Sequence, residues 1–202
     1  WNERVSAGDY FTFPTPISSW SPDGKLVLSQ TRAATFEIWS WEKREKAHSL
    51  ELAFVNASCH AWSPDSINLA LAAHQDAPAP VIQVFDTRRG ELRDPWKFEP
   101  FYALAWSHDG TRIAARAHGG TLRVLSSADG TQLAKSAATL HISKYFGAGA
   151  LLWSPDDKQI VLATNGALLL YDPADGRLVR EFNVSVFGNA WQFLDDSILL
   201  LA

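Results

Sequence analysis

The sequence predicts an all-β fold made of repeated four-stranded antiparallel units, and three observations lead to this prediction. A Trp-Ser-Pro-Asp motif recurs along the chain, and successive copies lie 42, 44, 47 and 38 residues apart. Apolar and β-branched runs of strand length follow each copy. The run that ends in each Trp is apolar on both faces, as in a strand that is covered twice. Repeats of about 40 to 45 residues with four strands each are typical of β-propeller blades.

Each copy of the motif has the chemistry of a hairpin turn. Pro fixes φ at the second turn position, Asp accepts hydrogen bonds from nearby backbone, and Gly closes the turn. The copies are Trp20-Ser21-Pro22-Asp23-Gly24, Trp62-Ser63-Pro64-Asp65, Trp106-Ser107-His108-Asp109-Gly110, Trp153-Ser154-Pro155-Asp156 and, more loosely, Trp191-Gln192-Phe193-Leu194-Asp195. We therefore expect four full blades and part of a fifth, with the tryptophans packing between blades.

The remaining strands of each unit can be placed in the same way. A second strand follows the turn, as in 25–28 and 159–163, and a third strand follows at 35–39, 81–85, 121–125 and 167–171. A second turn then ends in Gly90, Gly130 or Gly176. The fourth strand, for example 177–182, is more polar, as expected of an outer edge.

These residues resemble the WD40 family of β-propellers over nearly the whole chain, from about Trp20 to Ala202. The chain departs from the family pattern at two places. Its third strands end in Trp39-Ser40, Phe85-Asp86, Leu125-Ser126 and Tyr171-Asp172, so the family's Trp-Asp pair is absent, and so is the Gly-His pair that opens a repeat. The resemblance implies a propeller whose blades depend more on apolar packing than on that polar network.

Residues 1–202 are expected to form one propeller segment with repeat anchors near positions 20, 62, 106, 153 and 191. An open propeller exposes an apolar blade face and unpaired strand edges. One solution is that the chain is a segment of a larger propeller, which we favour. The other is a five-bladed ring in which the stretch around Tyr10-Phe11-Thr12-Phe13 completes the last blade.

Composition narrows the classes of function. The chain has 47% hydrophobic and 20% charged residues, which is typical of a globular protein. Its net charge of −4 does not favour nucleic-acid binding, and no apolar run is long enough for a membrane span. The one cysteine, Cys59, is interpreted as a small buried side chain, and a nucleophilic pair with His60 is the alternative. Low cysteine content and no signal segment make the cytoplasm the default placement.

The sequence contains none of the common catalytic, nucleotide-binding or zinc motifs. No two of the six histidines share metal-ligand spacing, although a metal site assembled across blades would leave no local pattern. We therefore expect no catalytic residues, no metal and no cofactor. The recurring turn aspartates are interpreted as turn formers.

A partner would bind where two sets of loops converge on one rim of the propeller. These are the loops before the Trp-Ser-Pro-Asp strands and the loops between second and third strands, and WD40 proteins commonly bind peptides or partner domains there. Aromatic and arginine side chains are enriched in interface hot spots. The alternative is that the aromatics fill the core at the channel end. The candidate residues are Arg32, Gln75, Asp76, Phe101, Tyr102, His118, Tyr145, Phe146, Asn165 and Phe187.

The sequence thus favours a non-catalytic scaffold that binds other proteins or peptides as a subunit of a larger assembly. The alternative is an accessory or gating propeller of a hydrolase or peptidase. A propeller fold hosts many activities, so only a site can decide between them.

Overall fold

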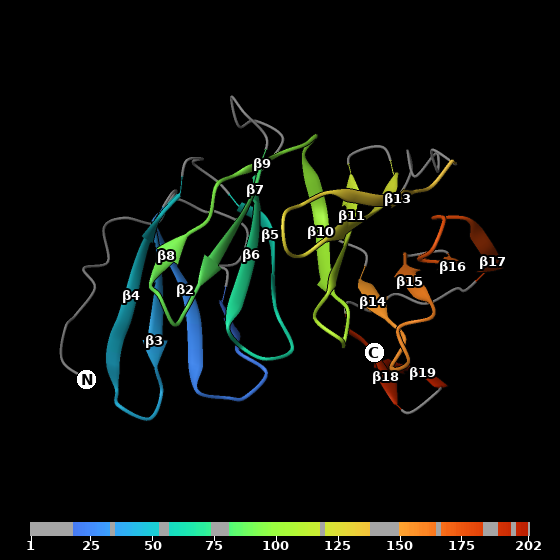
Figure 1. The fold of residues 1–202 in the computed structure, drawn as a ribbon. Helices are drawn as coiled ribbons and strands as arrows, with labels where there is room; N and C mark the ends of the chain where they lie inside the picture. Colours follow the sequence, from blue (N-terminus) through green and yellow to red (C-terminus); the bar gives the residue numbers. More distant parts are fainter. Residues whose placement is uncertain are drawn as a thin grey trace.

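The computed structural model describes residues 18–32, 35–52, 57–73, 81–117, 120–137, 150–164, 167–183, 190–194 and 197–201. All regular structure within these ranges is β-strand (Figure 1). No helix in the described part of the chain could cross a membrane. The strands form successive antiparallel sheets that follow one another in chain order, and we number these sheets as blades 1 to 5.

Each blade is a meander in which sequential strands pair. Blade 1 contains β1 (Ser18–Trp20), β2 (Leu26–Arg32), β3 (Thr35–Ser40) and β4 (Glu45–Glu51). Blade 2 contains β5 (Ala57–Trp62), β6 (Asn68–Ala73) and β7 (Val81–Asp86), with an outer strand split into β8 (Glu91–Leu92) and β9 (Trp96–Lys97), both paired with β7.

The later blades repeat this order. Blade 3 contains β10 (Phe101–Trp106), β11 (Arg112–Ala117), β12 (Leu122–Ser126) and β13 (Gln132–Lys135). Blade 4 contains β14 (Leu151–Trp153), β15 (Ile160–Ala163), β16 (Ala167–Tyr171) and β17 (Leu178–Asn183). A two-stranded sheet of β18 (Ala190–Leu194) and β19 (Ser197–Leu201) represents blade 5. The predicted all-β architecture of four-stranded antiparallel blades is therefore confirmed.

The Ser-Pro-Asp turns have the same hydrogen bonds in the first four blades. In blade 1, Ser21 Oγ donates to Asp23 Oδ1 over 2.7 Å, and the Leu26 N–H donates back to Ser21 Oγ over 2.9 Å. Ser63, Ser107 and Ser154 make the equivalent pairs in blades 2 to 4. In blade 4, the hydrogen bond from Ser154 is the main reason that the pKa of Asp156 falls to about 2. Each serine thus ties the start of its turn to the next strand.

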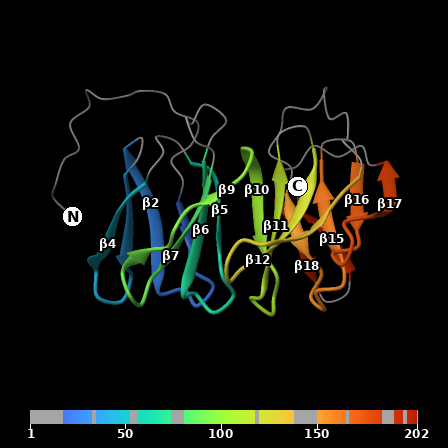
Figure 2. The same cartoon turned by 45° about the horizontal axis from the view of Figure 1, so that its top comes forward.

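Three apolar cores lie between successive blades in the described residues. Successive residues of an inner strand point to opposite faces, so one strand contributes side chains to two cores. In β6, Leu69 and Leu71 face blade 1, whereas Ala70 and Ala72 face blade 3, and all four side chains are fully buried. In β11, Ile113 likewise faces blade 2. The predicted double coverage of the inner strands is seen in Figure 2, where the blades stand side by side. The inner strands of blades 2 and 3 are therefore held from both faces.

The motif tryptophans link blades by hydrogen bonds as well as by packing. The Trp106 indole N–H donates to the Ala61 carbonyl of blade 2 over 2.9 Å, and the Trp153 N–H donates to the Ala105 carbonyl of blade 3 over 3.0 Å. Trp62 instead donates to the Ser19 hydroxyl of blade 1 over 3.0 Å.

Trp20 differs from the packing role expected of it. Its side chain is 50% exposed and meets Trp41 edge-on, with ring centroids 5.1 Å apart. Trp62, Trp106 and Trp153 bond to the preceding blade, and the described residues contain no blade before blade 1. The Trp191 side chain lies outside the described side chains.

Candidate functional site

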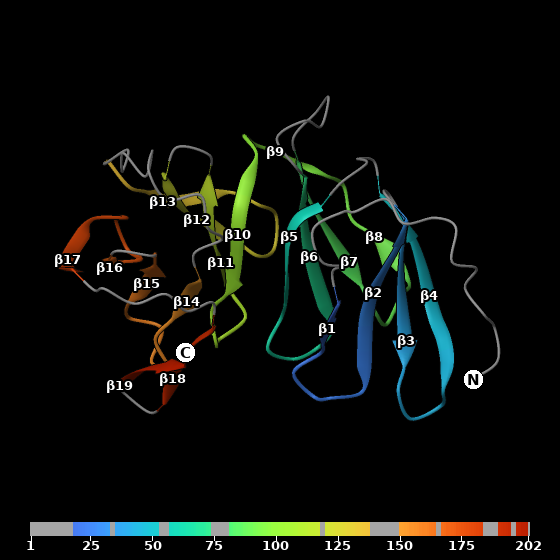
Figure 3. The ribbon, with the colours of Figure 1, turned by 180° about the vertical axis from the view of Figure 1, so that it is seen from behind.

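The strand register places the two predicted sets of loops on the same edge of the blades. Phe101, the first residue of β10, lies opposite Ala117, the last residue of β11. Arg32 at the end of β2 lies opposite Thr35 at the start of β3. We call this edge the rim, and we call the opposite edge, which carries the Ser-Pro-Asp turns, the turn edge. Figure 3 shows the same two edges from behind.

The structure locates three of the candidate residues from the sequence. Arg32, Phe101 and Tyr102 all lie at the rim, with Arg32 in blade 1 and the two aromatics in blade 3. The structure describes the backbone of Arg32 but not its side chain. Blade 2 stands between these positions, so nothing brings Arg32 together with the aromatics. Outside the described residues lie Gln75, Asp76, His118, Tyr145, Phe146, Asn165 and Phe187.

Phe101 and Tyr102 differ in exposure although they are adjacent. Phe101 is 1% exposed, packs in the core between blades 2 and 3, and meets Phe98 edge-on with ring centroids 5.8 Å apart. The register shifts between Phe101 and Ala103, which leaves Tyr102 at a bulge. Tyr102 is half-buried. Phe101 therefore fills the core. Tyr102 is half-buried at the rim, where Phe182 at the rim end of β17 is also exposed, at 38%.

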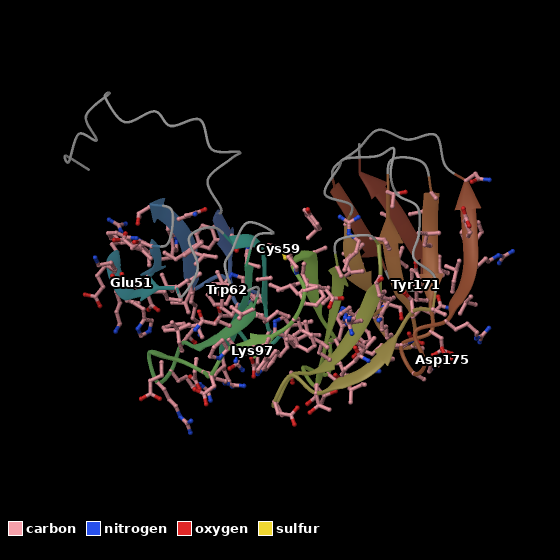
Figure 4. All side chains as sticks on the ribbon, turned by 90° about the horizontal axis from the view of Figure 1, so that it is seen from above. Glu51, Cys59, Trp62, Lys97, Tyr171 and Asp175 are labelled. Atoms are coloured by element: carbon pink, nitrogen blue, oxygen red, sulfur yellow. The ribbon has the colours of Figure 1, made fainter. Side chains whose placement is uncertain are left out.

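Arg116 lies beside Tyr102, with its guanidinium carbon 5.9 Å from the centre of the tyrosine ring. Only 7% of its surface is exposed, and its buried Nε has no hydrogen-bond partner. Burial lowers the pKa of Arg116, opposed by charge interactions with Cys59, Tyr102 and Tyr171. These three groups belong to blades 2, 3 and 4, and Figure 4 labels Cys59 and Tyr171 on the blades that flank blade 3.

The sequence analysis missed Arg116. Its signal was present, because Arg116 is a charged residue in the otherwise apolar stretch Ile113-Ala114-Ala115-Arg116-Ala117. A charge at such a position is rarely buried without a partner.

Cys59 and His60 point to opposite faces of β5. The Cys59 thiol approaches the Phe101 carbonyl of blade 3 at 3.7 Å, whereas His60 Nε2 lies 2.7 Å from the Ser19 hydroxyl of blade 1. Burial lowers the pKa of His60 to about 4, so its ring is neutral at pH 7. A neutral imidazole accepts from the Ser19 hydroxyl, whose oxygen accepts from Trp62. Cys59 is partly buried against the core between blades 2 and 3.

No cluster of His, Cys, Asp and Glu side chains among the described residues could hold a metal ion. The turn aspartates instead accept hydrogen bonds within their own turns, as Asp23 does from the Ser21 hydroxyl and from the Lys25 N–H. The described rim therefore offers half-buried Tyr102 and exposed Phe182 as aromatic surface, together with the buried Arg116 Nε, which has no hydrogen-bond partner.

No family model and no curated protein matches the chain, whereas many solved structures match its fold. A chain of Kuenenia stuttgartiensis hydrazine synthase is 16% identical with a TM-score of 0.68, and the match covers 91% of this chain and 53% of that one. A chain of the mitotic checkpoint complex is 16% identical with a TM-score of 0.67, over 82% of this chain and 50% of that one.

A third similar structure is described as a β-propeller domain. The β-propeller domain of Cps50 (Swd1) from Myceliophteria thermophila is 15% identical with a TM-score of 0.67, and the match covers 85% of this chain and 57% of that one. This chain thus spans about half the length of the solved chains that it resembles. Together, the blade topology and the propeller neighbour show that the chain has a β-propeller fold.

Proposed function

We propose that this chain is a non-catalytic platform that binds other proteins or peptides at its rim. The observation that carries the proposal is the contrast between the buried inner strands and the rim. The inner-strand side chains are committed to cores between blades, whereas Tyr102 is only half-buried at the rim end of β10. A rigid scaffold that presents loops is well suited to recognition, because little ordering entropy is lost on binding.

The structural neighbours support a role within an assembly. One neighbour is described as part of the mitotic checkpoint complex, which is by its name a protein assembly. At 16% identity the likeness carries no residue roles to this chain. The cytoplasmic placement expected from the sequence stays a prediction.

The test uses the full chain as bait, followed by cross-linking of the captured partner. We expect cross-links to map to the rim, and we expect Tyr102→Ala to weaken binding about ten-fold or more, because a tyrosine at an interface centre commonly contributes more than 1 kcal/mol. Tyr145→Ala tests a second predicted rim residue.

Trp41→Ala is the matched control. Trp41 is also an exposed aromatic residue, at 61%, but it follows β3 at the turn edge. Cross-links confined to the turn edge, or binding that depends on Trp41 and not on Tyr102, would refute the rim as the docking surface.

A second candidate function is that of an accessory propeller within an enzyme. The description of one neighbour as a hydrazine synthase favours it, since that name denotes an enzyme. In this case the partner captured by the bait would itself carry the catalytic activity. Its turnover would change when the chain is removed or when Tyr102→Ala replaces the native chain.

A further inference from the structure

Blade 1 has one face that no described blade covers, and this face carries side chains of the kind that the later blades bury. The strand register defines a line of three residues on each blade. It runs from the motif Trp to its partner in the second strand, and from there to the partner in the third strand. We call these three residues the packing row. In blade 1 the packing row is Trp20, Val27 and Trp39.

The packing rows of blades 2 to 4 are buried between blades. They are Trp62, Leu69 and Phe85 in blade 2, Trp106, Ile113 and Leu125 in blade 3, and Trp153, Ile160 and Tyr171 in blade 4. Each row belongs to the core shared with the preceding blade, and its second- and third-strand members are at most 2% exposed. A motif Trp followed by two large apolar side chains is thus the composition of a face that another blade covers.

The packing row of blade 1 has this composition but is open to solvent. Trp20 is 50% exposed, Trp39 is 40% exposed, and Val27 between them is only partly buried. Blade 1 stands at one end of the series of blades, and its other face packs on blade 2 (Figure 1). An exposed apolar patch of this kind on a folded protein marks an interaction site.

The indole N–H groups of the motif tryptophans indicate what the covering element offers. In blades 2 to 4, each indole donates to the residue just before the motif Trp of the preceding blade. The pairs are Trp62 with the Ser19 hydroxyl, Trp106 with the Ala61 carbonyl and Trp153 with the Ala105 carbonyl. Trp20 is the equivalent residue of blade 1. Its matching acceptor is therefore on the first strand of a blade that stands before blade 1 in space.

The opposite faces of the blades show which side chains pack against a packing row. Each offers a pair of aliphatic residues that lie opposite one another in the second and third strands. The pairs are Leu28 and Ile38 of blade 1, Ala70 and Val84 of blade 2, and Ala114 and Val124 of blade 3. Each pair shares a core with the row of the next blade and is at most 1% exposed.

The charged groups beside the packing row of blade 1 are compatible with a covered face. Glu37 accepts from the Trp39 indole N–H over 2.9 Å and pairs with Lys46 at 3.2 Å. Lys46 lies opposite Trp39 on the outer strand β4. Both partners of Glu37 belong to its own blade, so a covering blade leaves this carboxylate paired.

We propose that this face of blade 1 binds a further propeller blade of the same polypeptide, from outside residues 1–202. An aliphatic pair of that blade packs on Trp20, Val27 and Trp39, and the residue before its motif position accepts the Trp20 indole N–H. The same polypeptide is favoured as the source because this chain matches only 50% to 57% of each solved chain that shares its fold. The inference concerns the end face of the series of blades and does not depend on docking at the rim.

Hydroxyl-radical footprinting of the protein isolated from its natural source tests whether the row is covered. Mass spectrometry should find Trp20 and Trp39 oxidised about as slowly as Trp153, which is 2% exposed. Leu133 in the outer strand β13 is 51% exposed and gives the exposed reference after correction for intrinsic reactivity. Oxidation of Trp20 and Trp39 at rates that match 50% and 40% exposure would overturn the proposal.

A photoreactive residue identifies the element that covers the row. p-Benzoylphenylalanine at position 39 of the same protein should form cross-links to residues of its own polypeptide outside 1–202. Mixing unlabelled with ¹⁵N-labelled protein separates links within one polypeptide from links between copies. Links to a second copy, to another protein or to residues 1–17 would overturn the proposal, and so would the absence of any link. The photoreactive residue at position 133 is the control and should not link to that further blade.

The predicted hydrogen bond is tested by Trp20→Phe, which keeps an aromatic ring but removes the N–H. This change should lower the melting temperature of the natural protein by a few degrees, because a buried indole loses both packing and its hydrogen bond. Trp41→Phe is the matched control, since Trp41 is 61% exposed and lies outside the packing row. A Trp20→Phe variant that melts with the native protein would contradict a buried Trp20 and overturn the proposal.

Discussion

The fourth turn position shows how single residues couple neighbouring blades. Gly24 and Gly110 occupy it with φ near 71° in blades 1 and 3, whereas Ser66 and Asp157 occupy it in blades 2 and 4 with φ of 62° and 57°. Left-handed backbone costs a non-glycine residue about 1 to 2 kcal/mol. Both side chains bond across to the preceding blade, which offsets that cost.

At both cross-blade contacts, the number of acceptor oxygens on the side chain equals the number of backbone N–H groups that the neighbouring turn offers. Ser66 Oγ, one acceptor, receives the Asp23 N–H over 3.0 Å, because Pro22 beside it has no N–H to give. In blade 3 the proline is replaced by His108, and the His108 and Asp109 N–H groups each donate to one carboxylate oxygen of Asp157 over 2.8 Å. The departure from proline at His108 thus has a structural partner, Asp157, in the next motif along the sequence.

The first prediction compares Asp157→Gly with Ser66→Gly. Both changes relieve left-handed strain. Asp157→Gly removes two charge-assisted hydrogen bonds from backbone N–H groups and also the contact of Asp157 Oδ1 with His108 Nδ1 at 3.1 Å, whereas Ser66→Gly removes one neutral bond. Asp157→Gly should lower the free energy of unfolding by about 2 kcal/mol, and Ser66→Gly should change it by less than about 1 kcal/mol. Urea unfolding measures both. An Asp157→Gly variant as stable as the native chain would contradict the cross-blade contact.

The second prediction concerns His60 and mild acid. Burial lowers the pKa of His60 from 6.5 to about 4, so the unfolded chain takes up this proton at a higher pH than the folded chain does. Stability from this group is complete above pH 6.5 and is lost as the pH falls toward 4, with a total near 3 kcal/mol, or about 1.4 kcal/mol per pH unit at most.

Unfolding experiments between pH 7 and pH 4 on the native chain and on His60→Gln check this. The variant should lose this part of the pH dependence. Hydrogen bonding lowers the pKa of Asp23 and Asp156, so their stability contribution also begins to be lost as the pH falls toward 4. Both proteins contain these carboxylates, and their contribution cancels in the difference between the native chain and His60→Gln. A native chain whose stability is flat between pH 6.5 and 4 would refute the buried neutral histidine.

At the scale of the element, the second turn of each blade also contacts its neighbour. Gly130 and Gly176 close these turns by accepting positive φ, and their N–H groups donate to Ser126 and Asp172 carbonyls over 2.9 and 2.8 Å. A Cβ on Gly176 would lie 2.6 Å from the Lys135 carbonyl carbon in β13 of blade 3. Gly24 has nearly the same φ, and a Cβ there would meet nothing within 4 Å.

The third prediction uses this pair of glycines. Gly24→Ala should lower the free energy of unfolding by about 1 kcal/mol, which is the cost of left-handed backbone alone. Gly176→Ala adds a clash with backbone that cannot rotate away, so it should cost about 2 to 4 kcal/mol. Urea unfolding of the two variants decides the matter, and equal losses would mean that blades 3 and 4 are not in contact at this turn.

At the scale of the whole molecule, the cores between blades make the inner strands the most protected part of the chain. The inner strands β6 and β11 contribute side chains to cores on both faces, and opening either strand must separate it from two blades. The outermost strand of blade 4, β17, pairs only with β16 and is exposed along most of its length. Stability should therefore decline from the inner strands to the outer ones.

The fourth prediction follows for hydrogen exchange. Amides of β11 should exchange at least ten-fold more slowly than amides of β17 in the native state, because local opening frees β17 without separating blades. Exchange of intact chain followed by mass spectrometry measures both strands in one experiment. Equal protection of β11 and β17 would contradict a layered architecture in which the cores lie between blades.

The sequence by itself determined the blades. The spacing of Trp20, Trp62, Trp106 and Trp153 gave the period, and Ser-Pro-Asp turns placed the strands, because turn and strand preferences are local and need no knowledge of distant residues. Only the tertiary structure decided what those residues meet. Contacts between blades decide that Phe101 is core while Tyr102 is half-exposed, and that Asp157 caps the turn of blade 3. They also decide that Arg116 is buried, with no ion pair to it among the described residues. Such contacts join residues more than 40 positions apart in the sequence, and local preference carries no information about them.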